Sequence, residues 1–231
     1  MAIIEIKNLK KIFKSGDATI RAVDDISFSV EEGEFIAITG RSGSGKSTLL
    51  YQLGLLDTPT SGMIIISGHD VSLLDADERT AVRLNDLGYV FQDYANLPSL
   101  SAIENVMLPL LMQGMNETTA RKKAGDALAR VGLADRLENL PSELSGGQQQ
   151  RVAIARAIAH EPKIIFADEP TANLDSETSE TVLQVFLDLH ATGQTILMVT
   201  HELEYAKLAE RILVLSDGKL ITDEKVKKQT R

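Results

Sequence analysis

The sequence predicts an α/β fold with a mostly parallel sheet, an antiparallel β part near the N-terminus and an inserted block of helices. Strand-like apolar runs alternate with helix-like segments from residue 35 to 91 and again from residue 163, the order that forms parallel sheets. Ile26, Phe28 and Val30 alternate with polar residues, which is typical of a sheet with one wet face. Between residues 101 and 159 almost every segment has a helical period.

These patterns indicate one domain of 231 residues with an inserted subdomain. Residues 1–91 and 160–231 are expected to form the α/β core with its antiparallel part, and residues 92–159 the helical subdomain. No low-complexity linker marks the edges, and no solenoid repeat is present. The expected strands are 3–6, 22–30, 35–38, 62–68, 87–91, 163–167, 195–199, 211–215 and 219–222. A turn is expected at 14–17, a loop at 141–144 and a hairpin turn at 217–218. The expected helices begin at 48 and 101 or cover 77–84, 116–131, 147–159, 176–189 and 202–209. Ser101 and Glu104 are expected to form a capping box, Asn116 to cap the helix 116–131 and Gly132 to end it.

Composition limits the function classes. The net charge of −9 argues against nucleic-acid binding, which requires a basic face, although residues 225–228 are locally basic and are expected to be a solvated end. The absence of cysteine excludes disulfide and thiol chemistry and fits a reducing cytoplasm. The first residues lack the features of a signal peptide, and no apolar run approaches the ~20 residues that span a bilayer. We expect no direct membrane insertion, so at a membrane another chain would hold this one.

Residues 40–48 have the spacing of a phosphate-binding loop. They follow the apolar run 35–38 and precede a helix-like segment. Glycines let successive backbone N–H groups turn inward, and the helix N-terminus adds partial positive charge. Lys46 is expected to reach the β- and γ-phosphates, and the hydroxyl of Ser47 to bind Mg²⁺. The expected nucleotide site comprises Gly40, Ser42, Gly43, Ser44, Gly45, Lys46, Ser47 and Thr48.

A second apolar strand ends in two carboxylates, Asp168 and Glu169. Mg²⁺ prefers oxygen ligands, so Asp168 is expected to hold it. Glu169 is placed to orient an attacking water or take a proton from it. Solvated acids at a strand end are common, and it is the phosphate loop that favours the catalytic interpretation.

Three single residues carry less information on their own. Gln92 ends a strand and is most simply a solvated loop residue. His201 follows another strand and is most simply structural or a helix cap. Phe13 could stack on an adenine ring, but an isolated aromatic is more often part of the core.

Residues 144–151 read Leu-Ser-Gly-Gly-Gln-Gln-Gln-Arg. Ser145, Gly146, Gly147 and the following helix can form a second anion-binding nest, this one without a lysine. The plainer interpretation is a serine N-cap followed by flexible glycines. Each glycine inside a helix costs ~0.5–1 kcal/mol. Close approach of the backbone to a phosphate would offset that cost.

This stretch resembles the signature motif of the ATP-binding cassette (ABC) ATPases. The order of motifs is similar too: phosphate loop, Gln92, signature, Asp168-Glu169, residues 173–175 and His201. The resemblance covers essentially the whole chain and implies a P-loop NTPase core of the RecA-like type. At a finer level, residues 55–62 and 104–109 resemble the MacB/LolD-type subfamily, whose cell-division relative is FtsE.

The resemblance implies a role for each matching residue. Phe13 corresponds to an adenine-stacking aromatic that is often tyrosine in the family, and Gln92 to a residue that touches Mg²⁺ and senses the permease. Residues 93–98 depart from a more apolar family pattern, which leaves the detail of permease docking open. The implied catalytic residues are Glu169 as base, His201, Lys46 and Gln92; the implied metal ligands are Ser47, Gln92 and Asp168; the implied nucleotide contacts beyond the phosphate loop are Phe13, Ser145, Gly146, Gly147, Gln148 and, at the dimer interface, Asp175.

The resemblance also implies partners. Two molecules of ATP with Mg²⁺ would lie between the two ATPase subunits, identical or mixed, of a head-to-tail dimer attached to permease subunits on the cytoplasmic face of the inner membrane. Three alternatives stay open. One is an FtsE-like regulator that transports nothing. Another is a DNA-repair or chromosome ABC ATPase, against which the acidic charge and the absence of a long coiled-coil insertion argue. The last is a P-loop kinase, for which no acceptor site is recognisable.

Overall fold

The structure, a computed structural model, describes residues 2–16 and 18–226. It divides into two compact units. Unit 1 comprises residues 1–80 and 193–231, and unit 2 comprises residues 81–192. The predicted helical subdomain, residues 92–159, lies within unit 2. Of the predicted basic end, residues 227 and 228 lie outside the described part of the chain.

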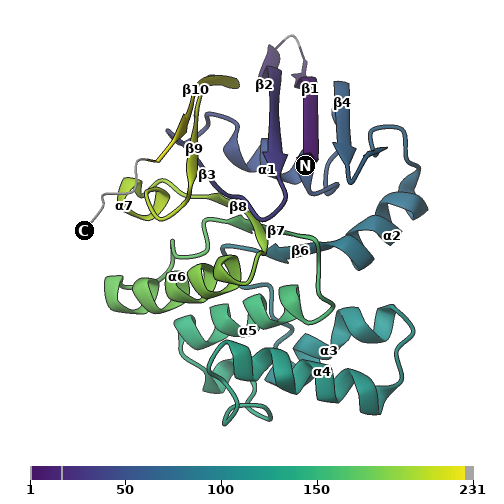
Figure 1. Ribbon diagram of the computed structural model, residues 1–231, viewed down its shortest axis with the longest axis vertical. Coiled ribbons are helices and arrows are strands. Elements are labelled where there is room, and N and C mark those ends of the chain that lie inside the picture. The colour runs from purple at the N-terminus through teal and green to yellow at the C-terminus, as the bar shows by residue number, and fades with distance from the viewer. Residues whose placement is uncertain (1, 17, 227–231) are drawn as a thin grey trace. The chain divides into compact units, whose positions relative to one another are not determined.

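Unit 1 contains an antiparallel sheet with strand order β2-β1-β4-β5 (Figure 1). The first two strands form a long hairpin whose ladder begins at the pair Ala2 and Glu31. Both strands are longer than predicted, because polar and charged residues occupy much of the hairpin and hide its alternation. Of the turn predicted at residues 14–17, residues 14 and 15 belong to β1, residue 16 is a turn residue and residue 17 lies outside the described part of the chain. The strands are β1 (Ala2–Ser15), β2 (Ala18–Glu31), β4 (Ser61–Ile66) and β5 (His69–Asp70).

The second sheet of unit 1 is mostly parallel. Its central strand, β3 (Phe35–Gly40), pairs in parallel with β8 (Thr195–Val199) and β9 (Arg211–Ser216). The last strand, β10 (Lys219–Lys225), returns antiparallel to β9, which confirms the predicted hairpin. The apolar residues of β3 and β8 are buried, in keeping with their continuous apolar sequences. Helices α1 (Lys46–Leu53) and α7 (Leu203–Ala206) also belong to this unit, and α7 is shorter than the predicted helix 202–209.

Unit 2 combines a parallel strand pair with helices. Strand β6 (Leu87–Val90) runs parallel to β7 (Ile164–Asp168). Helix α2 (Ala76–Asp86) begins in unit 1 and ends in unit 2. Three of the helices, α3, α4 and α5, pack against one another (Figure 1). The helices of unit 2 are α3 (Ala102–Met112), α4 (Glu117–Arg130), α5 (Gly146–Ile158) and α6 (Ser176–Ala191), with a 3₁₀ turn at Pro141–Glu143 where a loop was predicted.

Local signals set the helix ends of unit 2. Ser101 and Glu104 form the predicted capping box of α3. Asn116 caps α4 by accepting a hydrogen bond from the backbone N–H of Thr119. Gly132 follows α4 with φ 72°, a left-handed conformation that ends a helix. These predicted ends are therefore confirmed.

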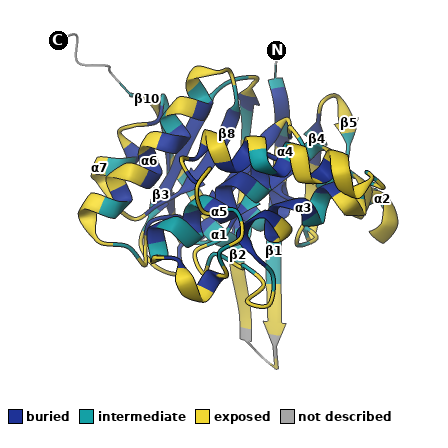
Figure 2. Cartoon of the chain, turned by 90° about the horizontal axis from the view of Figure 1, so that it is seen from below, coloured by how far each residue is buried: buried dark blue, intermediate teal, exposed yellow. Residues whose placement is uncertain are grey.

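Buried and exposed surfaces follow the elements. Figure 2 shows dark blue strands in the interior and yellow helix faces and loops outside. Helix α2 contains no buried residue. Over the described part of the chain, no helix combines the length and the apolar character needed to cross a bilayer. The fold class is confirmed: an antiparallel sheet, a parallel-dominated α/β core and a helical block.

Candidate functional site

The phosphate loop, residues 40–48, connects β3 to α1 in unit 1. Gly40, Gly43 and Gly45 have φ values of 146°, 77° and 97°, which favour glycine. Gly45 is also the N-cap residue of α1, so the loop leads directly into the helix. Strand, loop and helix follow one another as the sequence predicts.

At two of these positions, neighbouring strands also leave no space for a side chain. A Cβ atom at Gly40 would overlap a backbone carbonyl of β9, and one at Gly45 would overlap a backbone carbonyl of β2. In the β9–β10 turn, Gly218 donates its N–H to the carbonyl of Ser44 at 3.1 Å. Sequence reasoning assigned residues 217–218 to a hairpin turn and missed that this turn supports the phosphate loop.

Lys46 and Ser44 give the loop its polar interior. Lys46 is only 6% exposed, and its Nζ donates to the carbonyls of Gly40 and Arg41 at 3.0 Å each. The hydroxyl of Ser44 is buried and has no hydrogen-bond partner within the described residues. A buried hydroxyl without a hydrogen-bond partner raises the free energy of the folded state. A phosphate oxygen would accept the missing hydrogen bond. The loop therefore fits a polyphosphate ligand.

Strand pairing brings His201 to the same sheet edge as the phosphate loop. Strand β8 runs parallel to β3, with Val199 opposite Ile38, so the segments after both strands emerge at one edge. Thr200 donates its N–H to the carbonyl of Ile38 at 3.1 Å. The imidazole of His201 is half exposed and lies 3.3 Å from the carboxylate of Glu202.

Phe13 lies near the tip of the β1–β2 hairpin and is 44% exposed, in the region where Figure 2 shows both strands exposed. It is therefore not a core residue, contrary to the simplest interpretation of an isolated aromatic. The Nζ of Lys11 lies 5.1 Å from the ring centroid and is held by Asp57 at 2.6 Å and by the carbonyl of Thr58 at 2.7 Å. Lys11 thus makes a cation–π contact with the ring, and stacking on adenine stays a prediction.

Unit 2 brings Gln92 and the paired carboxylates to one edge in the same way. Strands β6 and β7 are parallel, with Val90 opposite Ala167. Gln92 and Asp168 therefore both lie at the carboxyl ends of these strands, on the same edge of the sheet. Asp168 is 7% exposed. Glu169 has φ 45°, a left-handed conformation that is unfavourable for a residue with a Cβ and is often found at functional sites.

The signature residues begin α5. Ser145 is the N-cap residue: its hydroxyl accepts from the N–H of Gln148, and the side chain of Gln148 accepts from the N–H of Ser145 at 2.9 Å. A Cβ at Gly147 would overlap the methyl group of Thr178, and one at Gly146 would lie 2.9 Å from the hydroxyl of Tyr94. The serine N-cap of the plainer interpretation is therefore confirmed. The two glycines also have a structural reason within unit 2, because close contacts leave no space for a side chain, whereas the sequence explained them only by the approach of a phosphate.

Asp175 is the N-cap residue of α6. Its carboxylate accepts from the backbone N–H of Thr178 at 2.9 Å and from the hydroxyl of Thr178 at 2.8 Å. These bonds lower the pKa of Asp175. In the segment just before it, Asn173 donates to the carbonyl of Gln92 at 3.2 Å. Unit 2 thus joins the Gln92 loop, the signature helix and residues 173–175.

Sequence reasoning missed Arg156, whose guanidinium binds the carbonyls of Tyr94 and Ala95 in the loop after Gln92. The available signal was a single arginine within the otherwise apolar run 152–159 of the signature helix.

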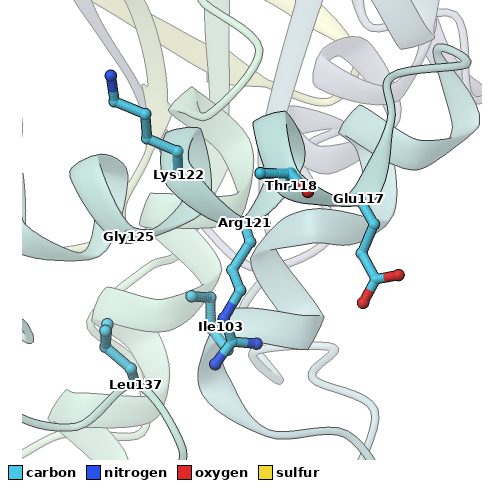
Figure 3. Close-up of a pocket in the computed structure, with 7 residues that line it drawn as sticks. All are labelled: Ile103, Glu117, Thr118, Arg121, Lys122, Gly125 and Leu137. Carbon is cyan, nitrogen blue, oxygen red and sulfur yellow. The ribbon is translucent and has the colours of Figure 1, made fainter.

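Two surface hollows contain none of the predicted site residues. One, in unit 2, has a volume of about 450 Å³ and is lined by residues of α3 and α4 with Leu137. Figure 3 shows Arg121 reaching toward Ile103 while Lys122 points away. The other, in unit 1, has a volume of about 480 Å³ and includes Lys10 and Asp24. Neither hollow is the predicted nucleotide site.

The fold and these loops define a P-loop nucleotide-binding protein. The ABC transporter family model matches residues 23–172. The chain is 48% identical to an uncharacterized ABC transporter ATP-binding protein, MJ1508, of Methanocaldococcus jannaschii over 95% of this chain and 98% of that one. It is also 47% identical to the macrolide export ATP-binding/permease protein MacB of Hyphomonas neptunium, over 96% of this chain and 34% of the relative. Among solved structures, the dimeric, ADP- and phosphate-bound form of the ATP-binding cassette MJ0796 matches with a TM-score of 0.90 and 43% identity, covering 98% of this chain and all of that one.

The chain therefore belongs to the ABC transporter family, as the signature motif predicts. It is an ABC-type ATPase, and ATPases of this family bind ATP with Mg²⁺. The chain spans about a third of the length of the MacB relatives that it matches.

Proposed function

We propose that this chain is the ATP-hydrolysing subunit of an ABC-type membrane complex, in which a head-to-tail dimer couples ATP binding and hydrolysis to movement of a partner permease. One observation carries the proposal. A single chain contains two glycine-rich helix starts of the kind that bind phosphate, one at α1 with Lys46 and one at α5 without a lysine. A dimer in which each start completes the other subunit's site uses both. The solved structure of the ATP-binding cassette MJ0796 is dimeric and contains ADP and phosphate, which supports the pairing of two such chains.

Each site residue then has a proposed role. Lys46 and the loop N–H groups bind the β- and γ-phosphates, and Phe13 stacks on the adenine. The partner's signature residues, counterparts of Ser145 to Gln148, contact the γ-phosphate, and Asp175 lies at the interface. His201 donates a hydrogen bond to the γ-phosphate. The full proposed set is Phe13, Gly40, Ser42, Gly43, Ser44, Gly45, Lys46, Ser47, Thr48, Gln92, Ser145, Gly146, Gly147, Gln148, Asp168, Glu169, Asp175 and His201.

The chemistry of the available donors fits Mg²⁺. Ser47, Gln92 and Asp168 offer hydroxyl, amide and carboxylate oxygens, the hard ligands that this ion prefers. In the described residues, no group of three or more acidic, histidine or cysteine side chains is arranged so that it could hold a metal ion by itself. When bound, Mg²⁺ would neutralise charge on the phosphate oxygens.

Catalysis by the chain itself is positioning and charge stabilisation. Glu169 accepts a hydrogen bond from the attacking water, or its proton, and Gln92 helps to orient that water. Lys46 and His201 stabilise the charge that develops on the γ-phosphate. Loss of the γ-phosphate removes the link between the two subunits, so the dimer opens and moves what is attached to it.

The partner and the cargo are proposed from the relatives. MacB proteins carry ATP-binding and permease parts in one chain, so we propose a permease with MacB/LolD-type topology as partner, at the cytoplasmic face of the inner membrane. An FtsE-like regulator that couples ATP to cell-wall or division work is the second candidate, favoured by the same subfamily motifs at residues 55–62 and 104–109. Co-purification of the permease followed by a transport assay separates the two.

The test of the catalytic proposal is Glu169→Gln. We expect the variant to bind ATP, to hydrolyse it ~10²–10⁴-fold more slowly and to accumulate as a dimer with Mg-ATP, measured by light scattering after size exclusion. Glu180→Gln, at an exposed position on α6, is the matched control and should behave like wild type. A Glu169→Gln protein that stayed monomeric with near-normal turnover would show that Glu169 is not the base.

A further inference from the structure

The loop that follows β6 holds two residues in an unfavourable backbone conformation. Tyr94 and Ala95 have φ values of 59° and 52°, in the left-handed region that residues with a Cβ rarely adopt. Consecutive residues in this conformation persist only where their surroundings hold them there. Gln92, which is proposed above to orient the attacking water, lies two residues earlier in the same loop.

Arg156 of the signature helix α5 binds both of these residues. Its Nη1 donates to the carbonyl of Ala95 at 2.6 Å and its Nη2 to the carbonyl of Tyr94 at 2.8 Å. The guanidinium is half-buried, and burial lowers the pKa of Arg156. Both bonds go to backbone carbonyls, so they depend on the path of the loop backbone and not on which side chains the loop carries.

Other contacts hold the two ends of the same loop. The side chain of Gln150 donates to the carbonyl of Phe91 at 3.4 Å, and Asn96 donates to the carbonyl of Gln149 at 2.9 Å. Asn173, which lies between the paired carboxylates and Asp175, donates to the carbonyl of Gln92. The backbone of Gln92 is thus fixed between Asn173 on one side and the Arg156 contacts on the other.

We propose that Arg156 is a positioning residue for ATP hydrolysis: by binding the carbonyls of Tyr94 and Ala95, it sets the course of the loop that presents Gln92. The proposal rests on the role of Gln92 proposed above. It follows that losing the two bonds lowers the turnover number and leaves ATP affinity unchanged, because the phosphate loop belongs to unit 1 and its contacts do not involve Arg156.

Arg151 provides a matched control. It lies on the same helix and donates to the carbonyls of Val131 and Gly132 at 3.0 and 3.4 Å, and burial lowers the pKa of Arg151 as well. Its partners stand at the end of α4 and not in the Gln92 loop. Arg156→Lys and Arg151→Lys therefore remove the same kind of bond from the same helix while keeping the charge.

The experiment compares these two variants of the full chain in steady-state ATPase assays. We expect Arg156→Lys to lower kcat by about ten- to a hundredfold with KM for ATP unchanged, as a small misplacement of a catalytic group does, and Arg151→Lys to keep wild-type kcat and KM. Equal losses in both variants would mean that Arg156 only stabilises α5, and would overturn the proposal.

A second measurement does not depend on turnover. Hydrogen–deuterium exchange should show faster uptake in residues 93–97 of Arg156→Lys, with uptake in residues 146–158 unchanged. Unchanged uptake in residues 93–97 would overturn the proposal even if kcat fell. Gln92→Ala is assayed in parallel: if it kept full turnover, the role proposed for Gln92 would fail, whereas the exchange result would still decide the contact made by Arg156.

Discussion

At the scale of single residues, Gly45 of the phosphate loop has to be glycine for two separate reasons. Gly45 takes a left-handed φ, and a Cβ there would also overlap a carbonyl of β2. The glycine spacing alone predicts the phosphate loop, since a loop that curls its N–H groups inward needs glycine. The overlap with β2 depends on a strand some twenty residues earlier in the chain, and nothing in the spacing indicates it.

Lys46 is the residue whose removal should most directly test nucleotide binding. Lys46→Ala removes an ammonium that would make charge-assisted bonds to phosphate, each worth about 1.5–3 kcal/mol, so we expect ATP affinity to fall at least about tenfold per bond lost. Isothermal titration calorimetry measures this directly. Lys163→Ala, which removes an ammonium 2.9 Å from Asp86 in unit 2, should bind ATP normally, and unchanged affinity in Lys46→Ala would count against the phosphate-loop assignment.

At the scale of elements, the start of α5 is fixed by contacts as much as by its cap. Ser145 and Gln148 close a capping box, of which sequence reasoning offered only the serine N-cap. The neighbouring helix α6 begins with Asp175, and its Thr178 leaves no space for a side chain at Gly147. The two helix starts therefore depend on each other.

This contact predicts a reciprocal pair of variants. Gly147→Ala should lower the melting temperature, because the new methyl group overlaps the methyl group of Thr178, and overpacking of this kind costs about 1–3 kcal/mol. Thr178→Ser removes that methyl group and keeps the hydroxyl that donates to Asp175. In the double variant the melting temperature should recover. A Gly147→Ala protein as stable as wild type by calorimetry would contradict the contact.

The same region predicts a pH effect. The bonds from Thr178 lower the pKa of Asp175 in the folded state, so the stability they add is present above the unfolded pKa, near 4, and is lost as the pH falls through the folded value. The difference in melting temperature between wild type and Asp175→Ala should accordingly shrink when thermal unfolding is repeated below about pH 4. A difference that stayed constant from pH 7 to pH 3 would show that the charge of Asp175 contributes nothing.

At the scale of the whole molecule, the proposed head-to-tail dimer can be tested by mixing two variants that are each inactive alone. Lys46→Ala damages the phosphate loop, and Ser145→Arg fills the signature nest with a large side chain, so each variant alone should be inactive. In mixed dimers one composite site combines the intact Lys46 of one chain with the intact Ser145 of the other. An equimolar mixture should regain roughly a quarter of the wild-type ATPase rate if the sites act independently. If the mixture stayed inactive although light scattering showed dimers, the head-to-tail arrangement would be wrong.

The sequence by itself determined the order of elements, the position of the phosphate loop, several helix ends and the family, because glycine spacing, caps and apolar periods are local. It underestimated the β1–β2 hairpin, where both strands carry charged residues, and extended α7 past Ala206. Only the tertiary structure placed Arg156 on the Gln92 loop, Thr178 against Gly147 and the β9–β10 turn beneath the phosphate loop. These contacts join residues from about 30 to 170 positions apart, and no local pattern of residues specifies which distant backbone atoms a side chain will meet.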